Sequence, residues 1–235
     1  MKLFVNQLKW QFVLLQKNNI ITISFVVTLI YAAILFVLND MEYLDKLLVS
    51  LVLMDPTTIG YFFIALAIYT ERKHQILPAI FVTPVNLHHY IISKVLSLSV
   101  VGIICSLALA FSVKETSFNL GLYLTGTLGI CVLSALLGIM VLPFASEFLN
   151  FAMISVPVVI VYVNLSLIDY LEGIDLGMFK YILPVQGALE LIVSALENRT
   201  GFQSINIFGI VSLCIWIPIF YFFAYRFFSK KIVHQ

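Results

Sequence analysis

Residues 20–38, IITISFVVTLIYAAILFVL, decide the fold class of this chain, because they form a long apolar run without a single charge. At about 1.5 Å per helical residue, a run of this length crosses the ~30 Å of hydrocarbon in a bilayer. A helix is the expected conformation, since every backbone polar group must find its partner inside the segment. The run also lacks the alternating polar residues of a transmembrane β-strand.

The same pattern recurs along the 235-residue chain, in which 62% of the residues are hydrophobic and 11% are charged. A soluble core cannot absorb so much apolar surface at this length. We therefore predict an all-α integral membrane protein with a single transmembrane domain over residues 1–235. The six predicted spans are about 20–38, 47–69, 92–113, 120–142, 148–168 and 205–228.

The distribution of Lys and Arg predicts how the chain is oriented. Six spans place both termini on one side, and that side holds nine of the 13 basic residues: Lys2, Lys9, Lys17, Arg72, Lys73, Lys94, Arg226, Lys230 and Lys231. The other side holds Lys46, Lys114, Lys180 and Arg199. By the positive-inside rule we expect a multi-pass protein of the cytoplasmic (inner) membrane with both termini in the cytoplasm.

Two further segments are amphipathic. Residues 1–17 place Phe4, Leu8, Phe12 and Leu15 on one helical face, which predicts an interfacial helix on the cytoplasmic side. Residues 169–200 begin as a polar external loop and continue into an apolar stretch too short to span the membrane. We expect short external helices there, packed on the bundle or dipping into the outer leaflet.

Motifs of catalysis are missing from the sequence. There is no GxxxxGK[ST] loop for ATP, no HExxH and no GxSxG. The neighbouring His88 and His89 would point about 100° apart on a helix, which makes a poor metal pair. We predict no catalytic residues, no metal site and no cofactor in this chain, and no nucleic acid as a partner.

Asp55-Pro56 interrupts the second span. A carboxylate at the centre of a span costs about 2.5–3.5 kcal/mol on insertion scales, so Asp55 requires an explanation. Asp followed by Pro is also a helix-start signature. Two interpretations stay open: Asp55 lines a polar cavity or the translocation path, or it caps the second of two helical pieces, 47–54 and 56–69.

The stretch ERKHQILPAIFVTP, residues 71–84, lies between two spans on the predicted cytoplasmic side. It opens with charged residues and ends at Thr83-Pro84. Its apolar side chains share one helical face: Ile76, Leu77, Ile80 and Phe81. The pattern favours a short helix parallel to the membrane, resting on lipid or in a groove of a soluble partner. A simple interfacial turn is the alternative.

This stretch resembles the segment after the second span in membrane subunits of ABC transporters of the ABC-2 permease type. Their pattern is roughly ER-x-x-G-T-L-x-A-L-x-VTP, followed by a basic residue in the next span. The matching residues are Glu71, Arg72, Leu77, Ala79, Val82, Thr83, Pro84 and Lys94. Gln75, Ile76 and Pro78 depart from the pattern. Residues 53–56 with 60–63 are similar to drug-export members, including fluoroquinolone permeases.

The resemblance implies the membrane subunit of an ATP-driven exporter. Residues 71–84 would be the coupling helix that binds a separate ATPase subunit, which carries ATP and Mg²⁺. The contact residues implied are Glu71, Arg72, Ile76, Leu77, Phe81 and Thr83. Two permease chains, identical or different, would pass a lipophilic drug, peptide or lipid-like substrate between them along spans one, two and five. Candidate path residues are Asp55, Thr58, Phe62, Tyr162 and Asn164.

Two other functions stay open. An ion-coupled secondary carrier would use Asp55 and would transport without an ATPase. A non-transporting membrane anchor would use residues 71–84 only to hold a soluble partner.

Overall fold

The computed structural model describes residues 2–38, 43–77, 86–114, 117–197 and 204–230. Six helical stretches in these ranges are long and apolar enough to cross a membrane, which confirms the predicted all-α membrane fold. They are α2 (Ile20–Val37), α3 (Leu44–Lys73), α5 (Leu87–Lys114), α6 (Leu120–Val141) with a 3-10 turn to Phe144, α7 (Phe148–Val159) continued to Tyr170, and α10 (Ser204–Phe228).

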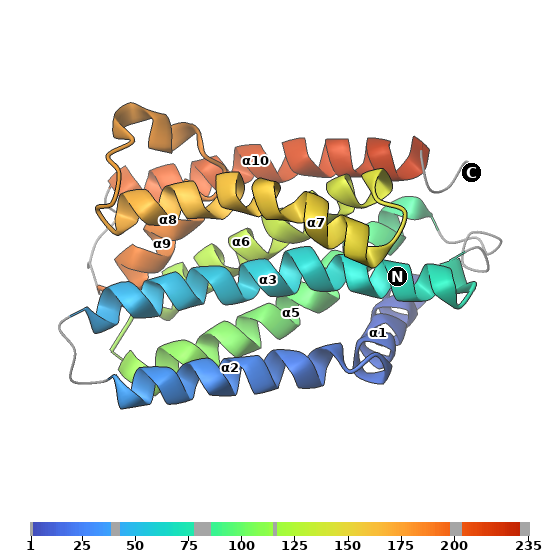
Figure 1. Cartoon of the computed structure of the whole chain (residues 1–235), viewed down its shortest axis with the longest axis horizontal. Coiled ribbons are helices and arrows are strands. Elements are labelled where there is room, and N and C mark those ends of the chain that lie inside the picture. Colours follow the sequence, from blue (N-terminus) through green and yellow to red (C-terminus); the bar gives the residue numbers. More distant parts are fainter. Residues whose placement is uncertain (1, 39–42, 78–85, 115–116, 198–203, 231–235) are drawn as a thin grey trace.

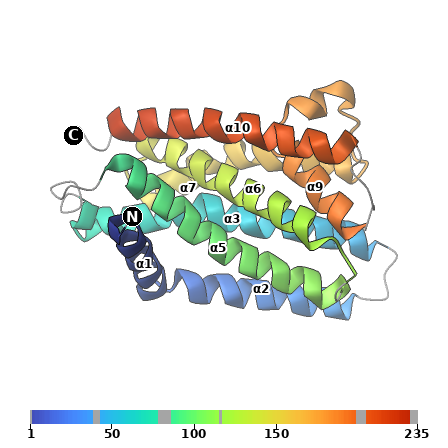
Figure 2. The same cartoon turned by 180° about the vertical axis from the view of Figure 1, so that it is seen from behind.

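The six spans run side by side along the long axis of the molecule (Figures 1 and 2). The helix α1 (Lys2–Lys17), the end of α3, the start of α5 and the end of α10 share one end of the bundle. Helix α1 is steeply inclined to the spans, as expected of a helix lying in a membrane interface. Asn19, at a left-handed φ of 58°, turns the chain from α1 into α2.

Helices α3 and α6 form the centre of the bundle, and small residues bring them together. A Cβ atom on Gly60 would lie 2.6 Å from the Cys131 carbonyl oxygen, and one on Gly138 would lie 2.6 Å from the Tyr61 carbonyl oxygen. Either contact is too short for a real carbon, so both positions require glycine. Such close approach is how helices gain packing energy in lipid, where the hydrophobic effect does not drive them together.

Helix α3 continues through Asp55 and Pro56, so the interpretation of a broken second span with Asp55 as a helix cap is wrong. Proline removes one backbone donor but does not end a helix whose neighbours hold it in place. Helix α5 packs against this point, where a Cβ on Gly102 would lie 3.7 Å from the Pro56 Cα. The Asp55 carboxyl is turned towards α2 and does not cap α3.

The fifth span changes its winding halfway. Helix α7 contains Pro157 and passes into a π-helical turn, Ile160–Asn164, before the short α8 (Leu165–Tyr170). Pro157 has no N–H to donate to the carbonyl one turn earlier, and π-turns commonly accompany such interruptions. The turn determines where Tyr162 and Asn164 lie.

Helix α9 (Gln186–Leu196) packs inside the bundle between α6 and α10. Every residue of α9 except Glu190 is buried. Its first turn lies against α10, since a Cβ on Gly187 would lie 2.9 Å from the Gly209 carbonyl oxygen. Helix α9 is thus packed on the bundle, which is one of the two predicted placements of the external segment. The preceding 3-10 helix, Gly177–Ile182, contains no buried residue.

Candidate coupling site and translocation path

Helix α3 ends at Lys73, so Glu71, Arg72 and Lys73 form its last turn and not the start of a separate coupling helix at residue 71 as predicted. The chain turns at residues 74–75. Gln75 adopts a left-handed φ of 57°, a conformation that glycine reaches without strain. The ABC-2 pattern has glycine at this position, so the geometry explains its preference physically. Ile76 and Leu77 are helical again, which places the beginning of a new helix at Ile76.

The six predicted ATPase-contact residues fall into different environments. Arg72 is exposed, Ile76 is half-buried, and Leu77 is 4% exposed and packs into the core. Phe81 and Thr83 lie outside the described residues, as does Pro78. Glu71 is 1% exposed, so its carboxylate faces the interior and not a surface on which a partner could bind.

Glu71 belongs to a buried polar cluster. Its Oε1 accepts a hydrogen bond of 2.7 Å from the Lys94 ammonium, and its Oε2 accepts one of 2.6 Å from the Tyr90 hydroxyl. Lys94, 2% exposed, also donates to the Gln11 Oε1 at 3.1 Å. Buried charges are stable when they are paired and hydrogen-bonded, and both conditions hold here.

The cluster joins three helices that meet the predicted coupling segment. Gln11 lies on α1, Glu71 on the last turn of α3, and Tyr90 and Lys94 on the first turns of α5. The segment between α3 and α5 is therefore anchored on both sides by one ion pair. Moving the end of α3 away from the start of α5 would separate two buried charges, which costs several kcal/mol.

Sequence reasoning identified Glu71 and Lys94 through the resemblance but missed Gln11 and Tyr90. A signal for the cluster exists in the sequence: Lys94 lies within the apolar α5 span, where an ionisable side chain needs a partner. The identity of that partner is not local information, because Gln11 is 83 residues away along the chain.

The two ends of the bundle differ in how their charges are paired. At the end opposite the cluster, Lys46 binds Glu172 at 2.8 Å, Lys114 binds Asp45 at 2.8 Å, and Lys180 lies 3.4 Å from Asp169. Lys46 lowers the pKa of the Glu172 carboxyl through its hydrogen bond and its charge. Partial burial lowers the pKa of Lys180, but Asp169 outweighs it, so the pKa of Lys180 is raised.

At the cluster end, most basic side chains make no salt bridge within the described ranges. These exposed residues are Lys9, Lys17, Arg72, Lys73, Arg226 and Lys230. A face of unpaired cations is the one expected beside anionic lipids or an acidic partner surface. The predicted cytoplasmic orientation of this end stays a prediction.

Asp55 is buried, with 3% of its surface exposed. The Thr28 hydroxyl of α2 lies 3.2 Å from its Oδ2, and the same hydroxyl lies 2.9 Å from the Ser24 carbonyl oxygen. Among the described residues, no cation lies within salt-bridge distance of Asp55. The carboxyl therefore sits beside a hydroxyl that it shares with a backbone acceptor.

Thr58 and Phe62 follow Asp55 on the same side of α3, at intervals of three and four residues. Thr58 is exposed and Phe62 is half-buried, 6.2 Å from the Phe151 ring of α7. Spans one, two and five adjoin one another on the face seen in Figure 1, where α3 runs between α2 and α7. This is the set of spans predicted to line the path.

Tyr162 and Asn164 belong to the π-turn of the fifth span. Tyr162 is 6% exposed and lines a cavity of about 450 Å³ with Leu137 of α6 and Leu183-Pro184 of the external segment. The Tyr162 hydroxyl is directed towards the Ser134 hydroxyl of α6. The Asn164 Oδ1 has no hydrogen-bond partner among the described residues. The structure thus groups Asp55, Thr58 and Phe62 on one helix face and places Tyr162 at a cavity that none of these three residues lines.

The chain was compared with known proteins and with models of protein families. No curated protein matches the chain. A family model does, over residues 2–235, and its description is the fluoroquinolones export permease protein family. The match covers almost the whole chain and agrees with the six apolar helices and with the ABC-2 resemblance of residues 71–84. The chain is therefore an export permease that belongs to the fluoroquinolones export permease protein family.

Proposed function

We propose that this permease exports a lipophilic drug-like substrate using ATP hydrolysed by a separate ATPase subunit. The supporting observation is the Glu71–Lys94 ion pair of 2.7 Å, which joins the two spans on either side of residues 74–86. An ATPase that binds this segment would move α3 and α5 as one unit. ATP and Mg²⁺ would be bound by the partner and not by this chain.

The proposed docking surface consists of the exposed end of α3, the turn after it and the segment that follows. Arg72, Lys73 and His74 are exposed there, while Leu77 is packed in the core. Arg72 and the sequence-predicted Phe81 and Thr83 are the contacts best suited to a partner. The role proposed for Glu71 is internal: it holds α3 against α5 while its neighbours bind the ATPase.

The complex should be purified with its ATPase and tested with Arg72→Glu combined with Phe81→Asp. We expect lost co-purification and lost ATP-dependent export, with the permease still folded. Lys9→Glu is the matched control, because Lys9 is an exposed cation of α1 at the same end of the bundle. Unchanged co-purification and export in the double variant would contradict docking at this segment.

Substrate would pass along the α2–α3–α7 face, against a second permease chain. Thr58, which is exposed there, and the half-buried Phe62 are the proposed path residues, with Asp55 behind them. Thr58→Trp would narrow this face and should reduce export while ATPase binding persists. Leu128→Trp, at an exposed position of α6, is the control.

An ion-coupled carrier is distinguished by its energy source. Vesicles that contain the permease alone and a proton or sodium gradient would accumulate substrate if Asp55 coupled transport to an ion. We expect no accumulation until the ATPase and ATP are added. If a gradient alone drove transport and Asp55→Asn abolished it, the result would support an ion-coupled carrier and contradict the ATPase proposal.

A further inference from the structure

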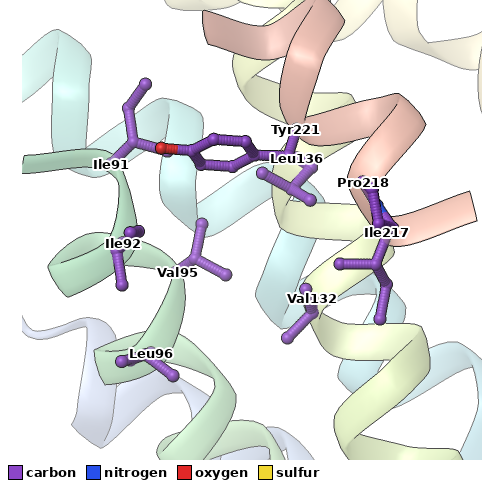
Figure 3. Close-up of a pocket in the computed structure, with 9 residues that line it drawn as sticks. All are labelled: Ile91, Ile92, Val95, Leu96, Val132, Leu136, Ile217, Pro218 and Tyr221. Carbon is purple, nitrogen blue, oxygen red and sulfur yellow. The ribbon is translucent and has the colours of Figure 1, made fainter. Parts of the chain in front are cut away.

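A groove lies between α5, α6 and α10, outside the α2–α3–α7 face of the proposed path. Its volume is about 380 Å³, within the range of small-molecule pockets of about 300–1,000 Å³. The walls are apolar side chains of three helices, as Figure 3 shows: Ile92, Val95 and Leu96 of α5, Val132 and Leu136 of α6, and Ile217 of α10.

Aromatic contacts close one end of the groove. His88 of α5 shares a hydrogen bond of 2.5 Å with the Tyr221 hydroxyl of α10, and its ring stacks on Tyr225 with centroids 4.2 Å apart. Beyond this junction the two helices leave a gap, and α6 forms its floor. Pro218 of α10 also lines the groove and has no backbone N–H. The groove is therefore apolar along its length and polar at one end.

The length of the groove along the helix axes matches the thickness of one leaflet. Ile91 and Leu96 lie about 6 and 14 Å from the start of α5, at 1.5 Å per residue. Tyr221 and Ile217 lie about 10 and 16 Å from the end of α10 by the same rise. Half of a ~30 Å hydrocarbon core is about 15 Å. The groove thus covers the acyl region of the leaflet at the cluster end.

The charges around the polar end favour an anion. His88 is exposed there, whereas His89 packs on the Phe4 ring of α1. Arg226, on the last turn of α10, and Lys230, just beyond α10, are also exposed. Of the described acids at this end, Glu71 is already paired with Lys94, and Glu147 is at the start of α7. Long basic side chains at helix ends extend to the level of lipid headgroups. Basic pockets between spans on this side bind anionic headgroups in other membrane proteins.

We propose that this groove is a binding site for an anionic phospholipid. One acyl chain occupies the space between α5 and α10, and the phosphate lies beside the His88–Tyr221 junction and the cations of α10. This inference does not depend on the proposed ATPase coupling, because the groove is formed by other faces of α5, α6 and α10.

The test uses the full chain in nanodiscs of phosphatidylcholine that contain a small fraction of phosphatidylglycerol with a photoreactive diazirine in its acyl chain. After irradiation, mass spectrometry maps the labelled residues. We expect labels to concentrate on 91–96, 132–136 and 217–221, and excess unlabelled phosphatidylglycerol to remove them. A phosphatidylcholine probe with the same diazirine should label these residues several-fold less.

Val132→Trp fills the floor of the groove and should abolish labelling there, whereas Leu128→Trp, one turn away at an exposed position of α6, should not. Val95→Phe gives a second, smaller obstruction if the tryptophan variant does not fold, which thermal unfolding would reveal. Arg226→Ala and Lys230→Ala should each weaken phosphatidylglycerol competition by up to about fivefold. Lys17→Ala, an exposed cation of α1, is the control.

Equal labelling of the groove and of Leu149 and Met153, which are exposed on α7, would overturn the proposal, because it would indicate ordinary annular lipid. So would equal labelling by the two headgroups. Cross-links between two protein chains at the groove would identify a second copy as the occupant instead. Competition by a lipophilic drug but not by phosphatidylglycerol would assign the groove to substrate.

Discussion

Two acidic side chains are buried on α3, Asp55 and Glu71, and they are stabilised in different ways. Glu71 faces a lysine, a tyrosine hydroxyl and, through the lysine, a glutamine of α1. Asp55 faces one threonine hydroxyl that is shared with a backbone carbonyl. Both side chains are almost completely removed from the surface, so the contrast lies in their partners and not in their burial.

This difference separates an acid that is held by several partners from one whose single partner is easily exchanged. A carboxylate with a matched cation and further hydrogen bonds holds helices in one arrangement, because separating the charges is costly. A carboxyl group that is hydrogen-bonded to one shared hydroxyl loses little stabilising free energy when that hydroxyl is exchanged for another partner. We infer that Glu71 stabilises the junction of α1, α3 and α5, while Asp55 is the acid on α3 whose partner can change during transport.

The largest effect is expected from Lys94→Met, which leaves the Glu71 carboxylate buried without its cation. The free energy of unfolding should fall by about 3–5 kcal/mol. The double variant Glu71→Gln/Lys94→Met should recover more than half of this loss, since neither charge remains. Unfolding of the purified protein in detergent measures both. Additive losses in the double variant would show that the two side chains do not form a coupled pair.

Tyr90→Phe should have the second largest effect, because it removes a hydrogen bond to a charged acceptor, worth about 1.5–3 kcal/mol. The matched control is Tyr123→Phe, which removes a 2.5 Å hydrogen bond to the neutral Ser106 carbonyl and should cost about 0.5–1.5 kcal/mol. Both variants are compared by unfolding in the same detergent. A smaller loss for Tyr90→Phe than for the control would weaken the assignment of a charged cluster.

Asp55→Asn should change the stability by less than about 1 kcal/mol, because asparagine retains an oxygen acceptor for Thr28. A rise in stability would also fit, since a carboxylate is costly within a span. Stability and ATP-driven export are measured on the same preparation. A loss as large as that of Lys94→Met would reveal a charged partner for Asp55 and remove the contrast with Glu71.

The smallest effect is expected from pH at the exposed Lys46–Glu172 pair. Lys46 lowers the pKa of Glu172 in the folded chain, so the pair stabilises the fold above the ordinary glutamate pKa of about 4.3. This contribution disappears as the pH falls through the lowered value. The melting temperature should fall slightly as the pH is lowered, and Glu172→Gln should remove this decrease. An identical decrease in the variant would assign it to other acidic side chains.

The candidate site was partly predictable. The apolar face that begins at Ile76 follows from a local pattern, but the predicted start of the helix at residue 71 is wrong, because residues 71–73 continue α3. The turn at Gln75 explains the glycine of the related pattern. The burial of Glu71 does not follow, because it depends on Tyr90 and Lys94, which are 19 and 23 residues away. The position of Tyr162 at a cavity with Leu137 and Leu183 likewise depends on the π-turn after Pro157, which local sequence patterns do not reveal.

The sequence alone determined that this chain is a bundle of six membrane-spanning helices with one strongly basic end. These properties are local: a charge-free apolar run of sufficient length forms a spanning helix whatever its neighbours are. The tertiary structure decided the continuity of α3 at Pro56, the depth of α9, the groove between α5 and α10 and the partners of the two buried acids. Each of these depends on which helices pack together, and in lipid that choice comes from close contacts such as those at Gly60 and Gly138 and from buried polar pairs.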